Sequence, residues 1–304
     1  MPSRAARVVL PLSILLAACA SAPVAQVPAA TREAQQAPSD SRIVFPAGVS
    51  QGALVFGKVP TGSTVRYGTR TLRATPYGTV VFGIGRDEVG PVQVAITRAD
   101  GSSQTIAIAI TPRDWPIETI DGVPPDTVNP PPDIAARIER EQAMVAAARV
   151  RDDDRADFVQ GFIWPVQGRI SGRFGNQRIY MLPDGSGTPK SPHSGMDIAA
   201  AEGTPVLAPG AGLVTFADPG LYLTGGTVLL DHGHGVSSNF LHLSRIDVKV
   251  GDRITQGQVI GTVGATGRAT GPHLHWGMNW FDVRIDPLLV LERTGNGKPP
   301  TSSP

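Results

Sequence analysis

Apolar and polar residues alternate along much of the chain after residue 42. Apolar residues occupy every second position in 92–96 and again in 106–110. A period of two predicts strands with one buried face, and the Asp100-Gly101 pair between the two runs predicts a hairpin turn. We therefore expect residues 41–111 to form a small antiparallel β-domain of sandwich type.

The pattern changes after residue 111. Seven prolines between 112 and 132 predict a stiff, extended linker. Apolar residues then recur at roughly helical spacing, with Asp133 as the candidate N-cap, which predicts a helix over 133–156. Two interpretations of this helix are open: it packs on one domain, which we favour, or it fixes the two domains relative to each other.

The C-terminal half again predicts strands. Between Trp164 and Leu289, short apolar runs such as 226–230 and 258–261 lie between glycine turns, with hardly any helical period. We expect a second β-domain over 160–292 and a disordered tail over 293–304.

The N-terminus has the pattern of a secretory signal, which we assign to residues 1–18. Arg4 and Arg7 precede an apolar run that ends at Cys19, the only cysteine of the chain. The surrounding residues resemble a bacterial lipobox, which implies cleavage before Cys19 and attachment of a lipid anchor. A signal that is cleaved without lipidation is the alternative. Residues 19–40 are rich in Ala, Pro and Gln and predict a flexible tether.

Composition adds two limits. Charged residues are only 17% of the 304 and the net charge is +1, so nothing indicates a nucleic-acid partner. A single cysteine excludes an intramolecular disulfide framework. The 35 glycines and 28 prolines favour turns and short strands.

Four of the six histidines fall into three short motifs. In Gly271-Pro272-His273-Leu274-His275 the two histidines point to one face if the segment is a strand, whereas on a helix they would diverge. His193 and Asp197 lie four residues apart, but Pro192 and Gly195 argue against a helix, so we expect a loop and then a strand. His242 lies in a third motif. Imidazole and carboxylate groups together are a normal ligand set for zinc.

These motifs resemble those of the lysostaphin-type (LytM-like) zinc metallopeptidases, which cut peptide bonds in bacterial peptidoglycan. The resemblance covers about residues 162–290 and includes the glycines at 251, 257, 261, 264, 267 and 271. It implies an antiparallel β-fold of the duplicated hybrid-motif type with a groove across one sheet. Phe240 stands where the family often has Tyr, which affects packing more than chemistry.

The resemblance also implies roles for five residues. One Zn²⁺ per chain would be bound by His193, Asp197 and His275, and His242 and His273 would be the catalytic histidines. The sequence does not assign which of the two is the general base. Residues 179–192 would form a mobile loop beside the groove, and we assign no substrate contact to Arg178 or Tyr180. His232 and His234 are each followed by a glycine, in Asp231-His232-Gly233-His234-Gly235, which indicates a turn rather than a second metal site.

The function implied is a zinc endopeptidase that acts on peptidoglycan peptides at the periplasmic side of the outer membrane, as a lipoprotein, or otherwise as a soluble periplasmic or secreted protein. The alternative is a non-catalytic relative that binds the cell wall and activates wall amidases, but such relatives lose the ligands that this chain keeps. The first β-domain would be a module for wall binding or for positioning, or else a spacer or a cover over the groove. Protein partners and the bond that is cut cannot be read from the sequence.

Overall fold

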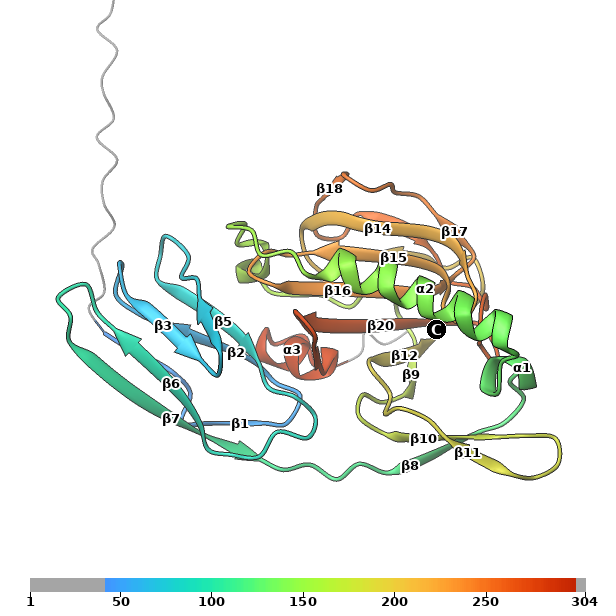
Figure 1. Cartoon of the computed structure of the whole chain (residues 1–304). Coiled ribbons are helices and arrows are strands. Elements are labelled where there is room, and N and C mark those ends of the chain that lie inside the picture. The colour runs from blue at the N-terminus through green and yellow to red at the C-terminus, as the bar shows by residue number, and fades with distance from the viewer. Residues whose placement is uncertain (1–41, 299–304) are drawn as a thin grey trace, which may run out of the picture. The chain divides into compact units, whose positions relative to one another are not determined.

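The computed structural model describes residues 42–298 and is built mostly of β-strands, as the sequence predicted (Figure 1). The expected signal, the tether with Cys19 and residues 299–304 lie outside the described residues. Within the described part, no helix has the length and apolar character needed to cross a membrane.

Residues 48–111 form two small sheets. A five-stranded sheet has the order β1-β7-β6-β3-β4, in which only β1 and β7 pair in parallel, and β2 pairs with β5. Arg98 N donates to Ser102 O across 2.8 Å, which closes the expected β6–β7 hairpin. The strands are β1 (Gly48–Ser50), β2 (Leu54–Lys58), β3 (Thr64–Tyr67), β4 (Arg70–Leu72), β5 (Thr79–Gly83), β6 (Val92–Thr97) and β7 (Ser103–Thr111).

The proline-rich segment is not only a linker. It contains the strand β8 (Ile117–Ile120) and the short helix α1 (Pro125–Val128). β8 pairs in parallel with β10 (Gln177–Met181), which also pairs with β11 (Gly187–Pro189). The physical reason is local: β8 lies between Pro116 and Pro124 and contains no proline, so all its N–H groups are available to a sheet.

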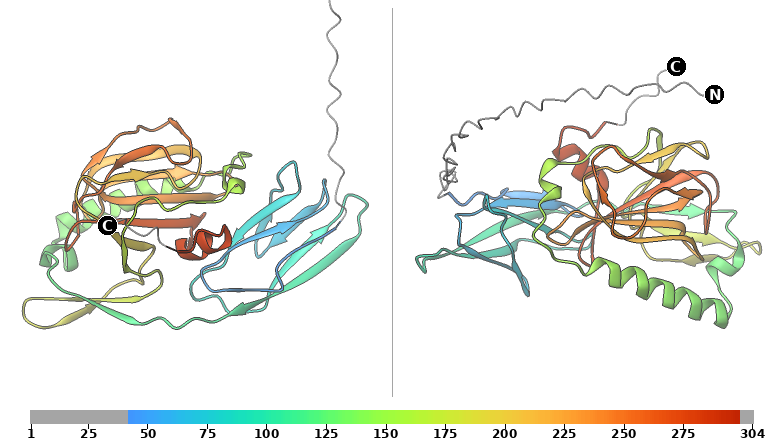
Figure 2. Two further views of the ribbon diagram at one scale, coloured as in Figure 1. Left: turned by 180° about the vertical axis from the view of Figure 1, so that it is seen from behind. Right: turned by 90° about the horizontal axis from the view of Figure 1, so that it is seen from above.

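Helix α2 spans Pro132–Arg149 and is therefore shorter than the expected 133–156. Its N-cap is Pro131 rather than Asp133, because Pro132 fits the first helical position. Val145 and Ala148 pack on an apolar cluster of strands β14 and β15, and both views of Figure 2 show α2 along this sheet. A short 3₁₀ helix, Asp157–Gln160, follows.

The C-terminal half contains an eight-stranded sheet of order β18-β14-β15-β16-β20-β12-β9, with β21 paired to β20. A three-stranded sheet, β13-β19-β17, accompanies it. The bounds are β9 (Arg169–Gly172), β12 (Met196–Ala199), β13 (Pro205–Leu207), β14 (Gly212–Leu221), β15 (Gly225–Asp231), β16 (Val236–Leu243), β17 (Arg245–Ile246), β18 (Arg253–Ile254), β19 (Val259–Thr262), β20 (His273–Trp280) and β21 (Val283–Ile285).

Strand β20 lies between β16 and β12 and carries the His-x-His motif. Leu274 and Trp276 are completely buried, as the alternation predicts for the face opposite the two histidines. Burial of each such side chain contributes about 1.5–3 kcal/mol to stability. The core therefore fixes which face of β20 the histidines occupy.

The chain remains ordered past the expected domain end at 292. Helix α3 (Pro287–Arg293) is capped by Asp286, whose side chain accepts from Leu288 N. Asn296 Nδ2 then donates to Phe162 O across 2.9 Å, and Trp164 Nε1 donates to Asn296 O across 2.6 Å. Residues 293–296 are therefore not part of a disordered tail, because these bonds attach them to the start of the C-terminal domain.

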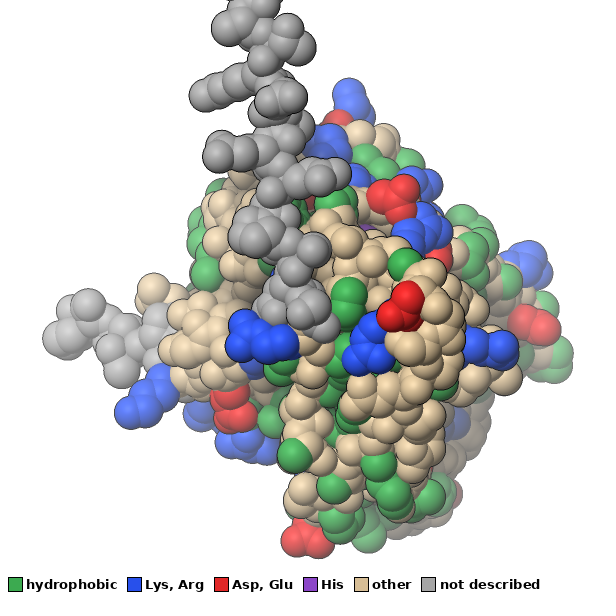
Figure 3. Space-filling model, turned by 90° about the vertical axis from the view of Figure 1, so that its left-hand side faces the viewer, with side chains coloured by type: hydrophobic (Ala, Val, Ile, Leu, Met, Phe, Trp, Pro, Cys, Tyr) green, Lys and Arg blue, Asp and Glu red, His purple; other side chains and the backbone are tan. Residues whose placement is uncertain are grey.

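One hydrophobic cluster includes side chains of both halves, among them Phe82 and Trp280, whose ring centroids are 6.5 Å apart. Arg113 Nη1 also donates to Asp286 Oδ2 across 2.8 Å. On the face seen in Figure 3, basic and acidic side chains are interspersed.

Candidate metal centre

Three of the predicted site residues meet at the pairing of β12 with β20. The two strands are antiparallel, and Asp197 is directly opposite His275. His193 lies in the loop that leads into β12, as Pro192 and Gly195 predicted. Residues separated by about 80 positions in the chain therefore become neighbours because of strand register.

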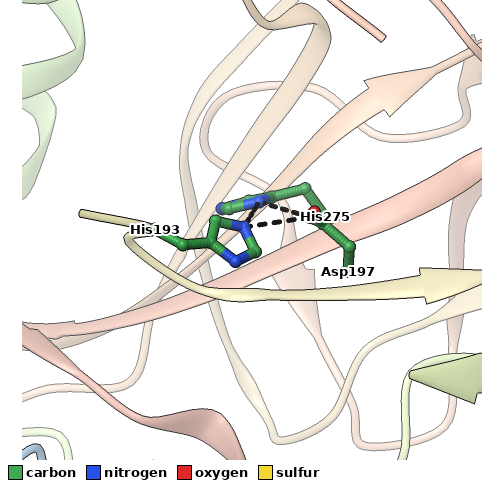
Figure 4. Close-up of side chains that lie close together, drawn as sticks. All are labelled: His193, Asp197 and His275. Carbon is green, nitrogen blue, oxygen red and sulfur yellow. Dashed lines mark hydrogen bonds and ion pairs between the residues drawn. The ribbon is translucent and has the colours of Figure 1, made fainter. Parts of the chain in front are cut away.

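The three side chains converge on one point (Figure 4). His193 Nε2 is 3.1 Å from Asp197 Oδ1 and 3.0 Å from His275 Nδ1, and His275 Nδ1 is 2.8 Å from Asp197 Oδ1. Ligand atoms about 2.0–2.1 Å from a tetrahedral zinc lie a little over 3 Å from one another. The spacing of these donors is close to that value.

Hydrogen bonding shows that the group fits a cation. His193 Nδ1 lies 2.9 Å from the carbonyl oxygen of Arg173, so it carries the proton and Nε2 is left as an acceptor. Nε2 then faces Asp197 Oδ1, also an acceptor, and two facing lone pairs repel unless a cation lies between them. A metal-binding histidine typically donates its other N–H to a backbone carbonyl in this way.

The charges of the centre are set by burial and by the contacts among its members. Burial opposes ionisation of Asp197, but His193 and His275 hold its pKa well below the usual value, so it is a carboxylate. Arg178 Nη2 donates to the other oxygen, Oδ2, across 2.5 Å. Burial lowers the pKa of His275 to about 4, so this imidazole is neutral, as a metal ligand must be.

The two remaining histidines face the same centre. His273 Nε2 is 3.8 Å from Asp197 Oδ1, and the rings of His242 and His273 are 4.8 Å apart. Each Nδ1 lies 2.8 Å from a backbone carbonyl oxygen, that of Thr266 for His242 and that of Gly271 for His273. The Nε2 atoms are thereby left to accept a proton.

His242 has an unusual backbone conformation. Its φ is +64°, a region that costs free energy for residues other than glycine. The register between β15 and β16 shifts near this point, which marks a bulge. The bond from His242 N to Thr224 O, 2.8 Å long, holds the conformation. The bulge aims the His242 side chain into the site.

His193, His242 and His275 line a groove with a volume of about 1020 Å³. Its walls come from distant parts of the chain: residues 85–89 of the first domain, the segment around Thr127 and Val128, and Ile138 and Gln142 of α2. The first domain and the proline-rich segment thus contribute directly to the groove. The expected loop over 179–192 contains the β10–β11 hairpin.

His232 and His234 do not join the centre. His232 is fully buried, with Nδ1 2.6 Å from Ala211 O and Nε2 2.8 Å from Ser238 Oγ. His234 Nδ1 lies 3.1 Å from Arg73 O. Within residues 42–298, the only group of His, Cys, Asp or Glu side chains spaced to hold a metal is His193, Asp197 and His275.

Comparison with known proteins identifies the family of this chain. Residues 191–287 match the model of Peptidase family M23. A peptidase M23 candidate from Pseudomonas aeruginosa, known from a crystal structure, is 30% identical to this chain in sequence. The structural match covers 80% of this chain and 94% of the Pseudomonas chain, with a TM-score of 0.58. The chain belongs to peptidase family M23. The resemblance found in the sequence is thereby confirmed.

Two curated relatives of this M23 chain have longer sequences. Cell division protein DipM of Caulobacter vibrioides is 31% identical over 55% of this chain and 26% of its own length. Peptidoglycan DD-endopeptidase ShyA of Vibrio cholerae is 41% identical over 36% of this chain and 24% of its own. The chain spans about a quarter of the length of these relatives.

Arg178 is the site residue that sequence reasoning missed. It bridges Asp197 and Glu118, whose Oε2 lies 3.2 Å from Arg178 Nε. No spacing in the sequence indicates this contact, because Glu118 belongs to a strand within a proline-rich segment. The one available signal was Arg178 itself, a basic residue close to the His193 motif.

Proposed function

We propose that this M23 protein is a zinc-dependent endopeptidase that hydrolyses peptide cross-links of bacterial peptidoglycan. The observation that carries the proposal is the convergence of His193, Asp197 and His275, with the imidazoles of His242 and His273 beside them. The substrate class is supported by the relative ShyA, a peptidoglycan DD-endopeptidase.

His193 Nε2, Asp197 Oδ1 and His275 Nδ1 would hold the zinc ion. Zinc bound by three protein ligands supplies a Lewis acid that polarises a carbonyl and makes water a nucleophile near neutral pH. Arg178 and the backbone carbonyl of Arg173 orient two of the ligands from outside.

His242 and His273 divide two tasks between them, proton transfer and stabilisation of the oxyanion. A neutral imidazole with an unoccupied Nε2 accepts a proton from the attacking water and returns it to the leaving amine. The second imidazole would stabilise the oxyanion of the tetrahedral species once its Nε2 also carries a proton, because its Nδ1–H is already bonded to a backbone carbonyl. The two rings share these tasks on one side of the centre.

The groove suits an extended peptide. Its volume of about 1020 Å³ exceeds what a single side chain needs, and its walls combine apolar and charged residues. A non-catalytic wall-binding protein that activates amidases is the competing function. It would not need a complete ligand set or two histidines with unoccupied Nε2 atoms.

Metal content and turnover test the proposal together. We expect one zinc per chain in the wild type and none in His275→Ala, and we expect purified sacculi to release peptide fragments that mass spectrometry detects. His234→Ala is the matched control, since His234 lies outside the centre. A folded wild-type protein that binds no zinc and releases nothing from sacculi would falsify the proposal.

We also propose that Cys19 carries a lipid that anchors the protein to the periplasmic side of the outer membrane. The support is the lipobox-like sequence at the only cysteine. Labelling cells with a radioactive fatty acid tests this: the label should enter the wild type and be lost in Cys19→Ser.

A further inference from the structure

Two arginines meet in a cavity beside the groove. The cavity has a volume of about 420 Å³ and lies between α2 and strands β15 and β16. Arg149, from the last turn of α2, and Arg284, from β21, both line it. Ser194, Leu241 and Arg284 line both this cavity and the groove of the metal centre, so the two spaces adjoin.

Neither guanidinium is neutralised by a carboxylate. Between described residues, no ion pair involves Arg149 or Arg284, and Arg149 Nε is buried without a hydrogen-bond partner. Glu141 also lines the cavity, but Arg137 Nε and Tyr222 N donate to its two oxygens, at 2.6 and 2.7 Å. The cavity therefore holds an excess of positive charge.

The charge costs free energy in the absence of a ligand. Burial, together with repulsion from Arg284, lowers the pKa of Arg149 to about 9, and burial also lowers the pKa of Arg284. Both arginines are partly buried, and arginines withdrawn from water are rare unless they are paired. An arrangement that keeps two of them close together without a counter-charge is expected where an anion binds.

Arg284 is oriented in advance. Its Nη1 donates to Asn279 Oδ1 across 2.7 Å, and Asn279 Nδ2 in turn donates to Asn239 Oδ1 across 3.1 Å. Both asparagines are almost completely buried. This chain of amides fixes the guanidinium while leaving most of its N–H groups free to bind a ligand.

We propose that Arg149 and Arg284 form a subsite for a free carboxylate of the peptide substrate, beside the centre where the peptide bond is cut. The subsite rests on the proposed function for the identity of its ligand. A carboxylate is the anion that a peptide brings into the adjoining groove, and a guanidinium binds it through two parallel N–H bonds. The pair would select peptides with a free carboxyl group next to the cross-link.

Paired substrates test the subsite. One is a synthetic cross-linked stem-peptide dimer with free carboxylates, and the other is the same dimer with carboxamides in their place. We expect the wild type to cleave the carboxylate form with a kcat/KM at least about tenfold higher, since hydrogen bonds to a charged group are worth about 1.5–3 kcal/mol. Arg149→Gln and Arg284→Gln should each reduce this preference, mainly through KM. Arg140→Gln, an exposed residue of the same helix, is the control.

A binding measurement separates this inference from the proposed function. Calorimetric titration of the intact His273→Ala protein, in which turnover is expected to be slow, with both dimers and with inorganic phosphate measures binding without cleavage. If the carboxylate dimer binds through the arginines but is never cleaved, the subsite stands and the proposed function fails. If the dimers are cleaved but all variants discriminate between them as the wild type does, the subsite is refuted. It is also refuted if phosphate binds through the arginines and neither dimer does.

Equal or higher thermal stability of the two Gln variants, expected from relief of the repulsion between the two arginines, shows that the variants fold.

Discussion

Arg178 contacts Asp197 through the carboxylate oxygen that the histidines leave unused. Oδ1 of Asp197 faces His193 and His275, whereas Oδ2 accepts from Arg178 Nη2 across 2.5 Å. The arginine therefore fixes the rotation of a carboxylate that is a candidate metal ligand. Arg178 is in turn held by Glu118 of β8.

Removal of Arg178 should weaken metal binding. In Arg178→Ala we expect zinc affinity to fall by about 10–100-fold, the usual effect of losing a group that orients a metal ligand. Competition with a chromogenic chelator measures this. Arg169→Ala, an exposed residue of neighbouring β9, is the control and should bind zinc like the wild type. Unchanged affinity in Arg178→Ala would mean that Asp197 needs no support.

Replacement of the two histidines that are not metal ligands should separate binding from catalysis. His242→Ala and His273→Ala should keep one zinc per chain, because neither residue belongs to the group of His193, Asp197 and His275 that would hold the metal. Turnover should fall by about 10²–10⁴-fold in each, the range expected for loss of a group that transfers protons. Metal analysis and fragment release from sacculi are the two measurements. Rates like those of the wild type in both variants would remove the proposed roles.

His232 should make stability depend on pH. Burial lowers its pKa from 6.5 to about 4, so between these values the unfolded chain binds a proton that the folded protein does not. The free energy of unfolding should therefore fall as pH drops from about 6.5 to about 4, by about 3 kcal/mol from this group.

His232→Gln keeps a donor for Ala211 O but does not titrate, so its stability should fall less over the same range. Urea denaturation of both proteins at pH 7, 5.5 and 4 provides the comparison. The other buried histidines are present in both proteins and cancel. Identical pH dependence would show that His232 is already protonated in the folded state or remains neutral in the unfolded one.

Local sequence rules were sufficient where a motif defines its own geometry. The alternation in β20 predicted which face carries His273 and His275, and Leu274 and Trp276 are buried on the other face. Pro192 and Gly195 predicted the loop before β12. Asp100-Gly101 predicted the hairpin between β6 and β7. In each case the determining interactions lie within a few residues of one another.

Contacts between distant segments were not predictable in this way. The composition of 112–132 indicates a linker, yet a stretch of it without proline pairs with β10. Arg149 and Arg284 meet only because α2 packs along β14 and β15. Neither contact has a periodic or short-range signature, so only the tertiary structure identifies it.

The pairing of β8 with β10 matters to anyone who shortens this protein. A fragment that begins at residue 160 retains all five site residues but loses Glu118 and exposes the side of β10 that β8 covers. Because an exposed strand edge can pair with another chain, such a fragment should self-associate. Because it lacks Glu118, it should also bind its metal with lower affinity. A fragment that keeps the support of the metal centre has to start upstream of Ile117.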